Sequence, residues 1–182
     1  MIAGHFGFAA GVKSRETGVP LWSLMLACQW LDVVFVPLFA LGIERIDVLP
    51  PGGYGRVVIH ADWTHSLLGA LVLSALLGSF FRGRTRFVVA AVSFSHWLLD
   101  LLVHRADMPL LPANAGGFPL LGFGLWRWPT AAAGLELLLV LVGGLLYWAA
   151  AKKVGPRDRA SQAGAIVIAS GLFTLALNLA GF

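Results

Sequence analysis

The chain has 182 residues, of which 58% are apolar and only 12% are charged. Soluble domains carry charges on roughly 25% of their residues, so this composition excludes an ordinary soluble domain and indicates a membrane protein. The net charge of +4 gives little reason to expect nucleic acid as a partner for so apolar a chain. Because a transmembrane helix needs about 20 residues, we expect a single membrane-embedded domain over residues 1–182.

The apolar segments of the chain predict helices throughout. Residues 1–12 would measure only about 18 Å as a helix, so this segment would reach about halfway through a bilayer as a half-helix. Five longer apolar stretches follow, each long enough to span a membrane. They cover residues 20–43, 63–81, 87–103, 130–151 and 163–182. We therefore predict an all-α polytopic membrane helix bundle with about five transmembrane helices and an N-terminal half-helix.

Lysine and arginine residues gather in alternate connections between the predicted spans. They lie at residues 13–15, 82–86 and 152–159, and the positive-inside rule places such connections in the cytoplasm. The connections 44–62 and 104–127 would then face the opposite side. With five spans, this pattern predicts an N-terminus inside and a C-terminus outside.

Polar residues are costly within a membrane span, and here they cluster. Asp32 lies near the middle of the first predicted span, while His96, Asp100 and His104 recur every four residues in the third. Residues four apart share one face of a helix, so these three form a polar stripe. At about 1.5 Å per residue, Asp32 lies about 18 Å above the start of its span, and His96 and Asp100 lie roughly 15 and 21 Å above theirs. The matching depths predict a shared site.

Two further histidines extend this pattern. His5 lies in the half-helix, about 12 Å above the cytoplasmic boundary, and His65 opens the second span at its outer end. Both could approach the centre of the membrane, from opposite sides. All five histidines of the chain thus lie in or beside apolar segments.

Neutral imidazoles and carboxylates are ligands of zinc and of other divalent metals. A His-x-x-x-Asp pair such as His96 and Asp100 offers both ligand types on one helical turn, and a metal would compensate the buried carboxylates. The alternative for any single group is a hydrogen bond between helices. Glu136, alone in the fourth span, fits either explanation.

Two stretches of the sequence resemble a known family. The string HADWTHSL at residues 60–67, followed by HWLLD at residues 96–100, is similar to motifs of the YdjM-like family of bacterial inner-membrane proteins. These are described as metal-dependent hydrolases and are also labelled LexA-binding. In that family an early His, a Pro-Asp-x-Asp stretch, a His-Arg-Gly-x-Thr-His-Ser stretch and a His-x-x-x-Asp stretch follow one another, and the similarity covers residues 1–104.

The resemblance implies where each family motif lies in this chain. The early His would be His5, the first Asp of the second motif Asp32, the Thr-His-Ser stretch residues 64–66, and the last pair His96 and Asp100. The second Asp is replaced by Val34, so one carboxylate is missing. Our hypothesis is that Asp62 supplies it from the next span. The order of these residues is also faintly similar to zinc-dependent phospholipase C, which points to phosphoesters.

The simplest chemistry at such a site is hydrolysis by metal-activated water. We expect one or two divalent ions, zinc or else manganese, and a lipid or lipid-linked substrate that enters sideways in the inner membrane of a bacterium. The candidate metal ligands are His5, Asp32, His65, His96 and Asp100, and the candidate catalytic residues are Asp62 and Asp32. The candidates for supporting the ligands or binding substrate are His60, His104, Arg105, Arg127 and Glu136.

Two other classes of function stay open. A chain of intramembrane His and Asp residues also builds relays in metal-ion or proton transporters and channels. That function needs polar residues from one face of the membrane to the other, and the first span has few of them on the basic side of Asp32. A partner-binding membrane protein is suggested only by the label of the family.

Overall fold

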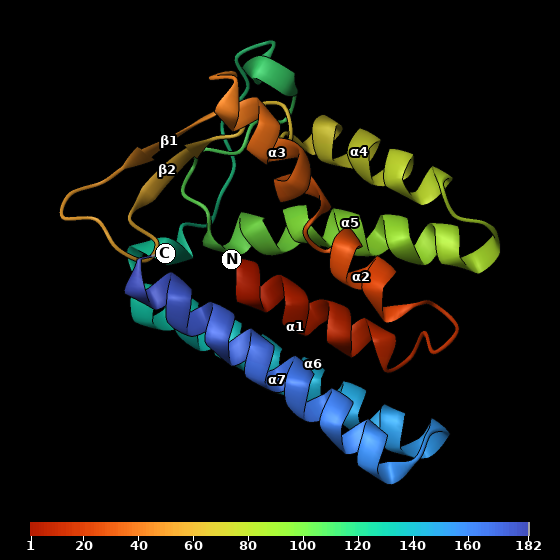
Figure 1. Cartoon of the computed structure of the whole chain (residues 1–182). Helices are drawn as coiled ribbons and strands as arrows, with labels where there is room; N and C mark the ends of the chain where they lie inside the picture. The colour runs from red at the N-terminus through yellow and green to blue at the C-terminus, as the bar shows by residue number, and fades with distance from the viewer. Residues whose placement is uncertain (182) are drawn as a thin grey trace.

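The computed structural model describes residues 1–181 and consists mainly of helices, as predicted (Figure 1). The helices in chain order are α1 (Ile2–Lys13), α2 (Leu21–Ala27), α3 (Trp30–Ala40), α4 (Leu67–Ser79), α5 (Gly83–Val103), α6 (Pro129–Val154) and α7 (Arg157–Ala180). The α6 and α7 helices pack side by side, and α1 packs against both. The α5 helix contacts α1, α2 and α3 and pairs with α4. Two 3-10 turns, η1 (Pro112–Asn114) and η2 (Leu125–Arg127), lie between α5 and α6.

The prediction of five full spans is not confirmed. Within the described residues, α5, α6 and α7 are long and apolar enough to cross a membrane, and the pair α2 and α3 gives a fourth span if it is counted as one. The α4 helix has only 13 residues, because the helix starts later than the apolar stretch. Ser66 caps it, and its Oγ accepts a hydrogen bond from the Gly69 backbone N–H at 3.0 Å, so residues 63–66 form a turn instead of a first helical turn.

The first predicted span is broken in its middle. The α2 and α3 helices meet at an angle of 47°, and Cys28 and Gln29 lie between them. Helix ends leave backbone carbonyls without helical partners, and at membrane depth such groups need partners from the protein. The Cys28 carbonyl finds one in His96, so the break is part of the site described below.

A β-hairpin, which was not predicted, fills most of the connection between α3 and α4. Its strands β1 (Arg45–Val48) and β2 (Val57–His60) pair antiparallel, with Ile46 opposite Ile59 and Val48 opposite Val57. Side chains alternate between the faces of a strand, so these four apolar residues share one face. A lone two-stranded hairpin is marginally stable. This hairpin is tied to the rest of the protein, because the Ile59 backbone N–H donates to Asp107 Oδ2 at 3.1 Å.

The α1 and α6 helices approach each other unusually closely because glycines line their contact. A Cβ atom at Gly7 would lie only 2.5 Å from the main chain of Leu139, and a Cβ atom at Gly143 would collide with the Gly7 carbonyl. Small residues allow helix backbones to touch in this way. This close packing fixes the short α1 helix inside the bundle, although it is too short to cross a membrane alone.

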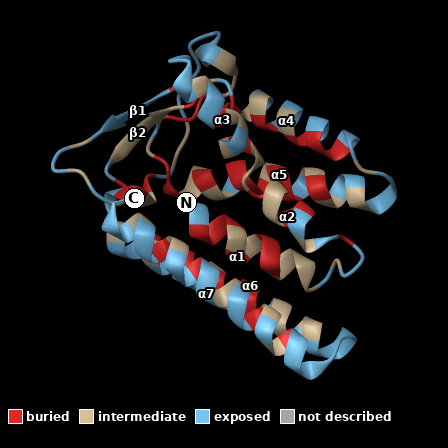
Figure 2. Ribbon diagram, in the orientation of Figure 1, coloured by how far each residue is buried: buried red, intermediate tan, exposed pale blue. Residues whose placement is uncertain are grey.

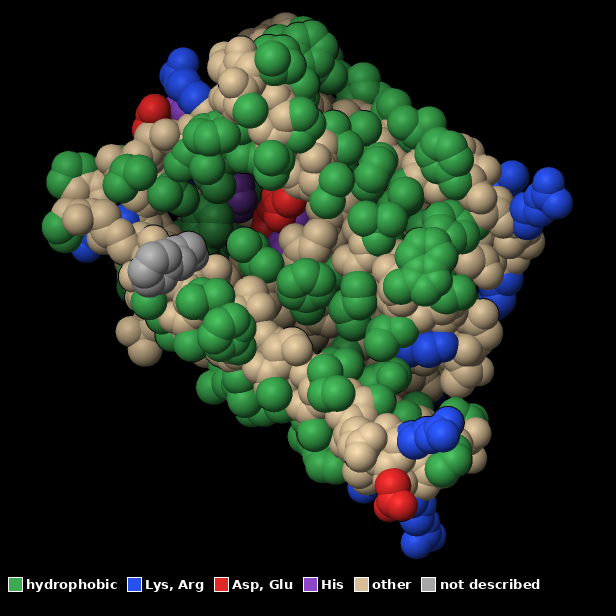
Figure 3. Space-filling model, viewed as in Figure 1, with side chains coloured by type: hydrophobic (Ala, Val, Ile, Leu, Met, Phe, Trp, Pro, Cys, Tyr) green, Lys and Arg blue, Asp and Glu red, His purple; other side chains and the backbone are tan. Residues whose placement is uncertain are grey.

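The two ends of the bundle differ in character. The connections α1–α2, α4–α5 and α6–α7 emerge at one end and carry Lys and Arg side chains (Figures 1 and 3). Behind that end lies an apolar cluster, buried among α1, α2, α4 and α5 (Figure 2). It is made of Ala9, Val19, Leu24, Ala27, Cys28, Leu77, Val89 and Val92. Most of the buried polar side chains lie farther from the basic end.

Candidate metal centre

Four histidines and two aspartates from four parts of the chain meet in one cluster. His5 comes from α1, Asp32 from α3 and His65 from the turn before α4. The α5 helix supplies the remaining members, His96, Asp100 and, directly after its last residue, His104. Five of the six are buried, and the Asp32 side chain is 38% exposed. We call these six residues the His/Asp cluster.

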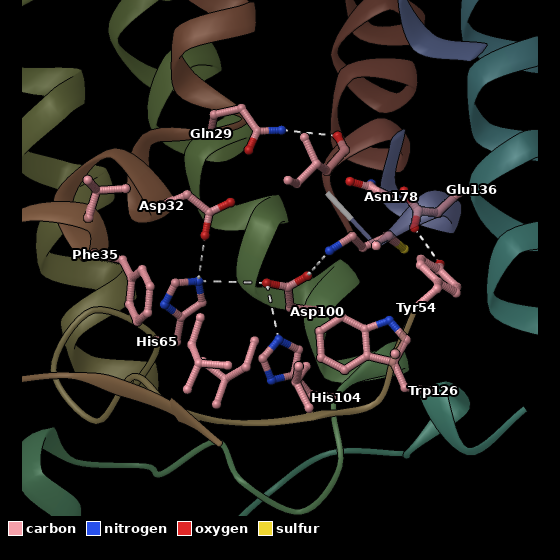
Figure 4. Close-up of a pocket in the computed structure, with 18 of the residues that line it drawn as sticks. Gln29, Asp32, Phe35, Tyr54, His65, Asp100, His104, Trp126, Glu136 and Asn178 are labelled. Carbon is pink, nitrogen blue, oxygen red and sulfur yellow. Dashed lines mark hydrogen bonds and ion pairs between the residues drawn. The ribbon is translucent and has the colours of Figure 1, made fainter. Parts of the chain in front are cut away.

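The ligand atoms of the His/Asp cluster lie within a few ångströms of one another, and Figure 4 shows four of the six residues, Asp32, His65, Asp100 and His104. Asp100 is central, because its Oδ1 lies 3.0 Å from His5 Nε2 and its Oδ2 lies 3.0 Å from His96 Nε2. His96 Nε2 is also 3.2 Å from His65 Nε2. Asp32 Oδ1 is 3.5 Å from His65 Nε2 and 3.6 Å from His96 Nε2.

The other ring nitrogens of His96 and His104 are held by acceptors outside the cluster. His96 Nδ1 donates to the Cys28 carbonyl at 2.7 Å, and His104 Nδ1 donates to Asp107 Oδ1 at 3.0 Å. A carbonyl and a carboxylate can only accept. Each neutral ring therefore carries its proton on Nδ1, and its Nε2 lone pair faces the centre.

His65 is held in the same way through a hydroxyl group. Its Nδ1 lies 2.8 Å from Thr64 Oγ1, which lies 3.0 Å from the carboxylate of Glu44. Because Glu44 only accepts, the Thr64 hydroxyl donates to it and accepts from His65. Glu44 is itself buried and also accepts from the backbone N–H groups of Trp63 and Thr64.

This donor set fits a divalent metal ion. The Nε2 atoms of His65 and His96 face each other and the carboxylates of Asp32 and Asp100, an arrangement that a metal ion, or a proton on one of the imidazoles, would stabilise. The ligand atoms form two groups, each within 4.8 Å: His5, His96 and Asp100, and Asp32, His65 and His96. Imidazoles anchored through Nδ1 to carbonyls or carboxylates are typical metal ligands, and divalent metal ions accept a mixture of His and carboxylate ligands.

Four members of the cluster, Asp32, His65, Asp100 and His104, line a cavity of about 780 Å³. Most of the lining is apolar and comes from α1, α3 and the apolar face of the hairpin, including Phe6, Val33, Val36, Ile46 and Val57. Figure 3 shows the mouth of this cavity, with acidic and histidine side chains at its floor and hydrophobic side chains around it. Val36 at the mouth is 62% exposed. The cavity therefore joins an apolar surface to a polar floor.

A second polar group lies elsewhere in the same cavity. Glu136 of α6 is fully buried, and it accepts hydrogen bonds from the Gly4 backbone N–H at 3.0 Å and from the Tyr54 hydroxyl. Burial and the neighbouring Glu136 carboxylate raise the pKa of Tyr54, so the phenol stays protonated and donates. Trp126 lines the cavity beside Tyr54 (Figure 4).

The structure brings together the five predicted metal ligands, His5, Asp32, His65, His96 and Asp100. Of the other candidates, His104 and Glu136 line the cavity.

Four candidates do not join them. Asp62, expected as a catalytic carboxylate, lies outside the groups that could share an ion and outside the cavity lining among the described residues. His60 pairs with Asp47 on the polar face of the hairpin, Arg105 donates to the Gly55 carbonyl, and Arg127 is exposed.

Several residues of the site were not predicted. Glu44, Tyr54 and Asp107 lie in connections that were expected to face water, and no pattern of spacing links them to the histidines. Thr64 was noted only within a motif. A signal was nevertheless present, since acidic residues beside an apolar stretch, as Glu44 is, are candidates for buried contacts.

Comparison with known proteins gives no relative for this chain. No family model, no curated protein and no solved structure matches it.

Proposed function

We propose that the protein is a membrane-embedded hydrolase that depends on a divalent metal ion and acts on a lipid or lipid-linked substrate. The observation that carries the proposal is the convergence of anchored Nε2 atoms and two carboxylates at the floor of a cavity with an apolar mouth. Helices of spanning length and composition support a membrane location. The proposal places the protein in the inner membrane of a bacterium, with the basic connections in the cytoplasm.

The metal ligands in this proposal are His5, Asp32, His65, His96 and Asp100. Asp100 contributes one oxygen to each side, towards His5 and towards His96, which suits either one ion or two. A divalent ion held there, zinc or manganese, would polarise a carbonyl or phosphoryl oxygen and make a water molecule more acidic.

His104 is the residue placed to move a proton. Asp107 holds its Nδ1–H, and its Nε2 lies at the cavity wall, 3.7 Å from Asp100 Oδ2. A carboxylate that orients an imidazole in this way favours proton uptake at Nε2. His104 therefore takes the role that the sequence assigned to Asp62, either accepting a proton from water or returning one to the leaving group.

The lipid character of the substrate rests on the position of the mouth. The hairpin covers one side of the cavity with its apolar face, and the mouth is surrounded by hydrophobic side chains. A water-soluble substrate would have to pass these surfaces, whereas the chain of a lipid would lie against Val33, Val36 and Phe6. The motif order shared with the YdjM-like family agrees with hydrolysis, and membership of that family is part of this proposal.

The alternative, a metal-ion or proton transporter, has less support. A transport pathway needs polar groups from one face to the other. Between the His/Asp cluster and the basic end lies the buried apolar cluster that includes Leu24, Leu77, Val89 and Val92. A site that apolar side chains separate from the basic end agrees better with catalysis than with the transport of ions across the membrane.

The first test is metal content. We expect the detergent-purified protein to carry one or two equivalents of zinc or manganese by elemental mass spectrometry, and His65→Ala and His96→Ala to lose most of it. His60→Ala is the matched control, because His60 lies on the outer face of the hairpin, and it should keep the metal. If folded wild-type protein holds no metal above background, the hydrolase proposal is wrong and transport becomes the better explanation.

A further inference from the structure

The cavity contains an acceptor that the proposed reaction does not use. The Glu136 carboxylate lines it and receives two hydrogen bonds, from Gly4 and from Tyr54. An ionised carboxylate has about four lone-pair positions, so it retains capacity for further donors. Glu136 is 0% exposed, and each further hydrogen bond offsets part of the cost of burying its carboxylate. A ligand that donates hydrogen bonds would supply them.

The same part of the cavity contains a donor with no well-formed hydrogen bond. Trp126 is 6% exposed, and its buried Nε1–H meets no acceptor among residues 1–181 at good hydrogen-bond geometry, although the Tyr54 hydroxyl is close enough to interact with it. Buried polar groups nearly always have a partner. The indole packs on His104 at 4.5 Å between ring centroids, and Figure 4 shows its nitrogen on the side of the cavity where Tyr54 and Glu136 lie. A ligand that fills the cavity would therefore offer the Trp126 Nε1–H a better-placed acceptor.

The charges of the lining restrict the chemistry of that ligand. Asp32, Asp100 and Glu136 all line the cavity, and no Lys or Arg is among the described residues that do. The amino nitrogen of Met1 also lies there, 3.7 Å from Asp100 Oδ1. A head group beside Glu136 therefore gains by carrying hydrogen-bond donors, and Gln29 and Asn178 add amide groups at the same wall.

We infer that Tyr54, Trp126 and Glu136 form a head-group subsite for a membrane lipid that carries hydrogen-bond donors, namely an ammonium or hydroxyl group. The Glu136 carboxylate accepts from the donor, and the Trp126 N–H donates to an ester or phosphate oxygen of the same lipid. This inference deepens the proposed function, because the subsite would present the lipid to the His/Asp cluster. It does not need the metal, however, and is tested without it.

The experiment compares three lipids with identical acyl chains on chelator-treated, delipidated protein, by native mass spectrometry. Dioleoyl phosphatidylethanolamine and phosphatidylglycerol carry donors in their heads, and dioleoyl phosphatidylcholine carries none. We expect phosphatidylethanolamine to bind about tenfold more tightly than phosphatidylcholine, the scale of one hydrogen bond to a charged group. Phosphatidylglycerol shows whether a hydroxyl serves as well as an ammonium.

Two variants assign the preference to the subsite. Glu136→Gln should reduce the preference for phosphatidylethanolamine to about twofold or less, because a neutral amide attracts an ammonium more weakly. Trp126→Phe should weaken the binding of all three lipids by a similar factor and leave their ratio unchanged, because the N–H donor that it removes serves an ester or phosphate oxygen that all three lipids share. Asp158→Asn, the same change of charge on the exposed start of α7, is the control and should behave as wild type.

Equal binding of all three lipids to the wild-type protein would overturn the inference. A preference that survives unchanged in Glu136→Gln would overturn it as well. If Glu136→Gln does not fold, Tyr54→Phe takes its place, since it removes the hydrogen bond that orients the carboxylate. A protein that holds no metal but shows the preference would refute the hydrolase proposal alone, and a metal-loaded protein without the preference would refute the subsite alone.

Discussion

Three imidazoles of the His/Asp cluster, those of His65, His96 and His104, are oriented by a hydrogen-bond partner at Nδ1. For His65 that partner is the hydroxyl oxygen of Thr64, and behind it lies the carboxylate of Glu44. The chain from Glu44 to His65 fixes both the tautomer and the ring plane. Without Glu44 the Thr64 hydroxyl would be free to donate to His65 Nδ1, which would place the ring proton on Nε2, towards the centre.

Glu44→Gln should therefore weaken metal binding without touching a ligand. Partners of this kind are worth about 10- to 100-fold in metal affinity, and we expect a loss in that range by titration against a competing chelator. Asp62→Asn is the control, because it changes a carboxylate that is close to Thr64 in the sequence but lies outside the cluster. This variant should bind metal as the wild type does. The reverse result, a loss in Asp62→Asn alone, would restore Asp62 as the missing carboxylate.

At the scale of the element, the short α1 helix contributes to both polar regions of the cavity. It carries His5 and also donates the Gly4 N–H to Glu136, so its position affects both polar regions of the cavity. Its N-terminal end, where a helix carries partial positive charge, lies beside the carboxylates of Asp100 and Glu136. The depth of α1 is set by its glycine contact with α6.

A methyl group at that contact should displace the helix. Gly7→Ala places a Cβ atom 2.5 Å from the Leu139 backbone, and overpacking of this kind costs about 1–3 kcal/mol. We expect a lower thermal midpoint in detergent and weaker metal binding. Gly134→Ala in α6 is the matched control, because its Cβ atom would meet nothing within 4 Å, and it should be neutral or slightly stabilising.

At the scale of the whole molecule, the bundle is polarised. One end carries the basic connections, and the hairpin, the cavity and the start of α6 lie towards the other. If the positive-inside rule holds for this chain, the cavity opens in the half of the membrane away from the cytoplasm. Its lipid would then come from the outer leaflet.

Cysteine accessibility tests this orientation. Cys28 is buried, so Cys28→Ala gives a background without cysteine. On it, Ala115→Cys, in the exposed connection after α5, should react in intact cells with a membrane-impermeant maleimide. Thr17→Cys, between α1 and α2, should react only after the membrane is opened. The opposite pattern would invert the topology and move the cavity to the inner leaflet.

Helical periodicity and depth were sufficient to predict the core of the site. The four-residue spacing placed His96 and Asp100 on one turn, and matching depths brought in Asp32 and His5. Asp62 lies outside the cluster and the cavity lining among the described residues, whereas its assignment assumed that the second span begins at Trp63. In the structure Ser66 caps that helix, so Asp62 lies in the turn before it and not on the face of a helix that it would share with His65.

Helical periodicity and depth could not predict Glu44 and Tyr54, the residues that hold the Thr64 hydroxyl and the Glu136 carboxylate. Glu44 reaches Thr64 only because the chain returns through the hairpin, and the pairing of two short strands is a long-range event that spacing alone does not encode. Tyr54 reaches Glu136 for the same reason, since it lies in the loop that connects the two strands of the hairpin.

The interruption between α2 and α3 has an implication for protein engineering. A continuous helix through residues 21–40 would be more regular and, by ordinary helix propensity, easier to form. It would also withdraw the Cys28 carbonyl from His96 and turn Asp32 to a different side. Substitutions chosen only to make this segment a better helix should therefore raise the stability of the protein and disrupt the geometry of the His/Asp cluster. The bend between α2 and α3 is a position where a selection for stability and a selection for activity would favour different residues.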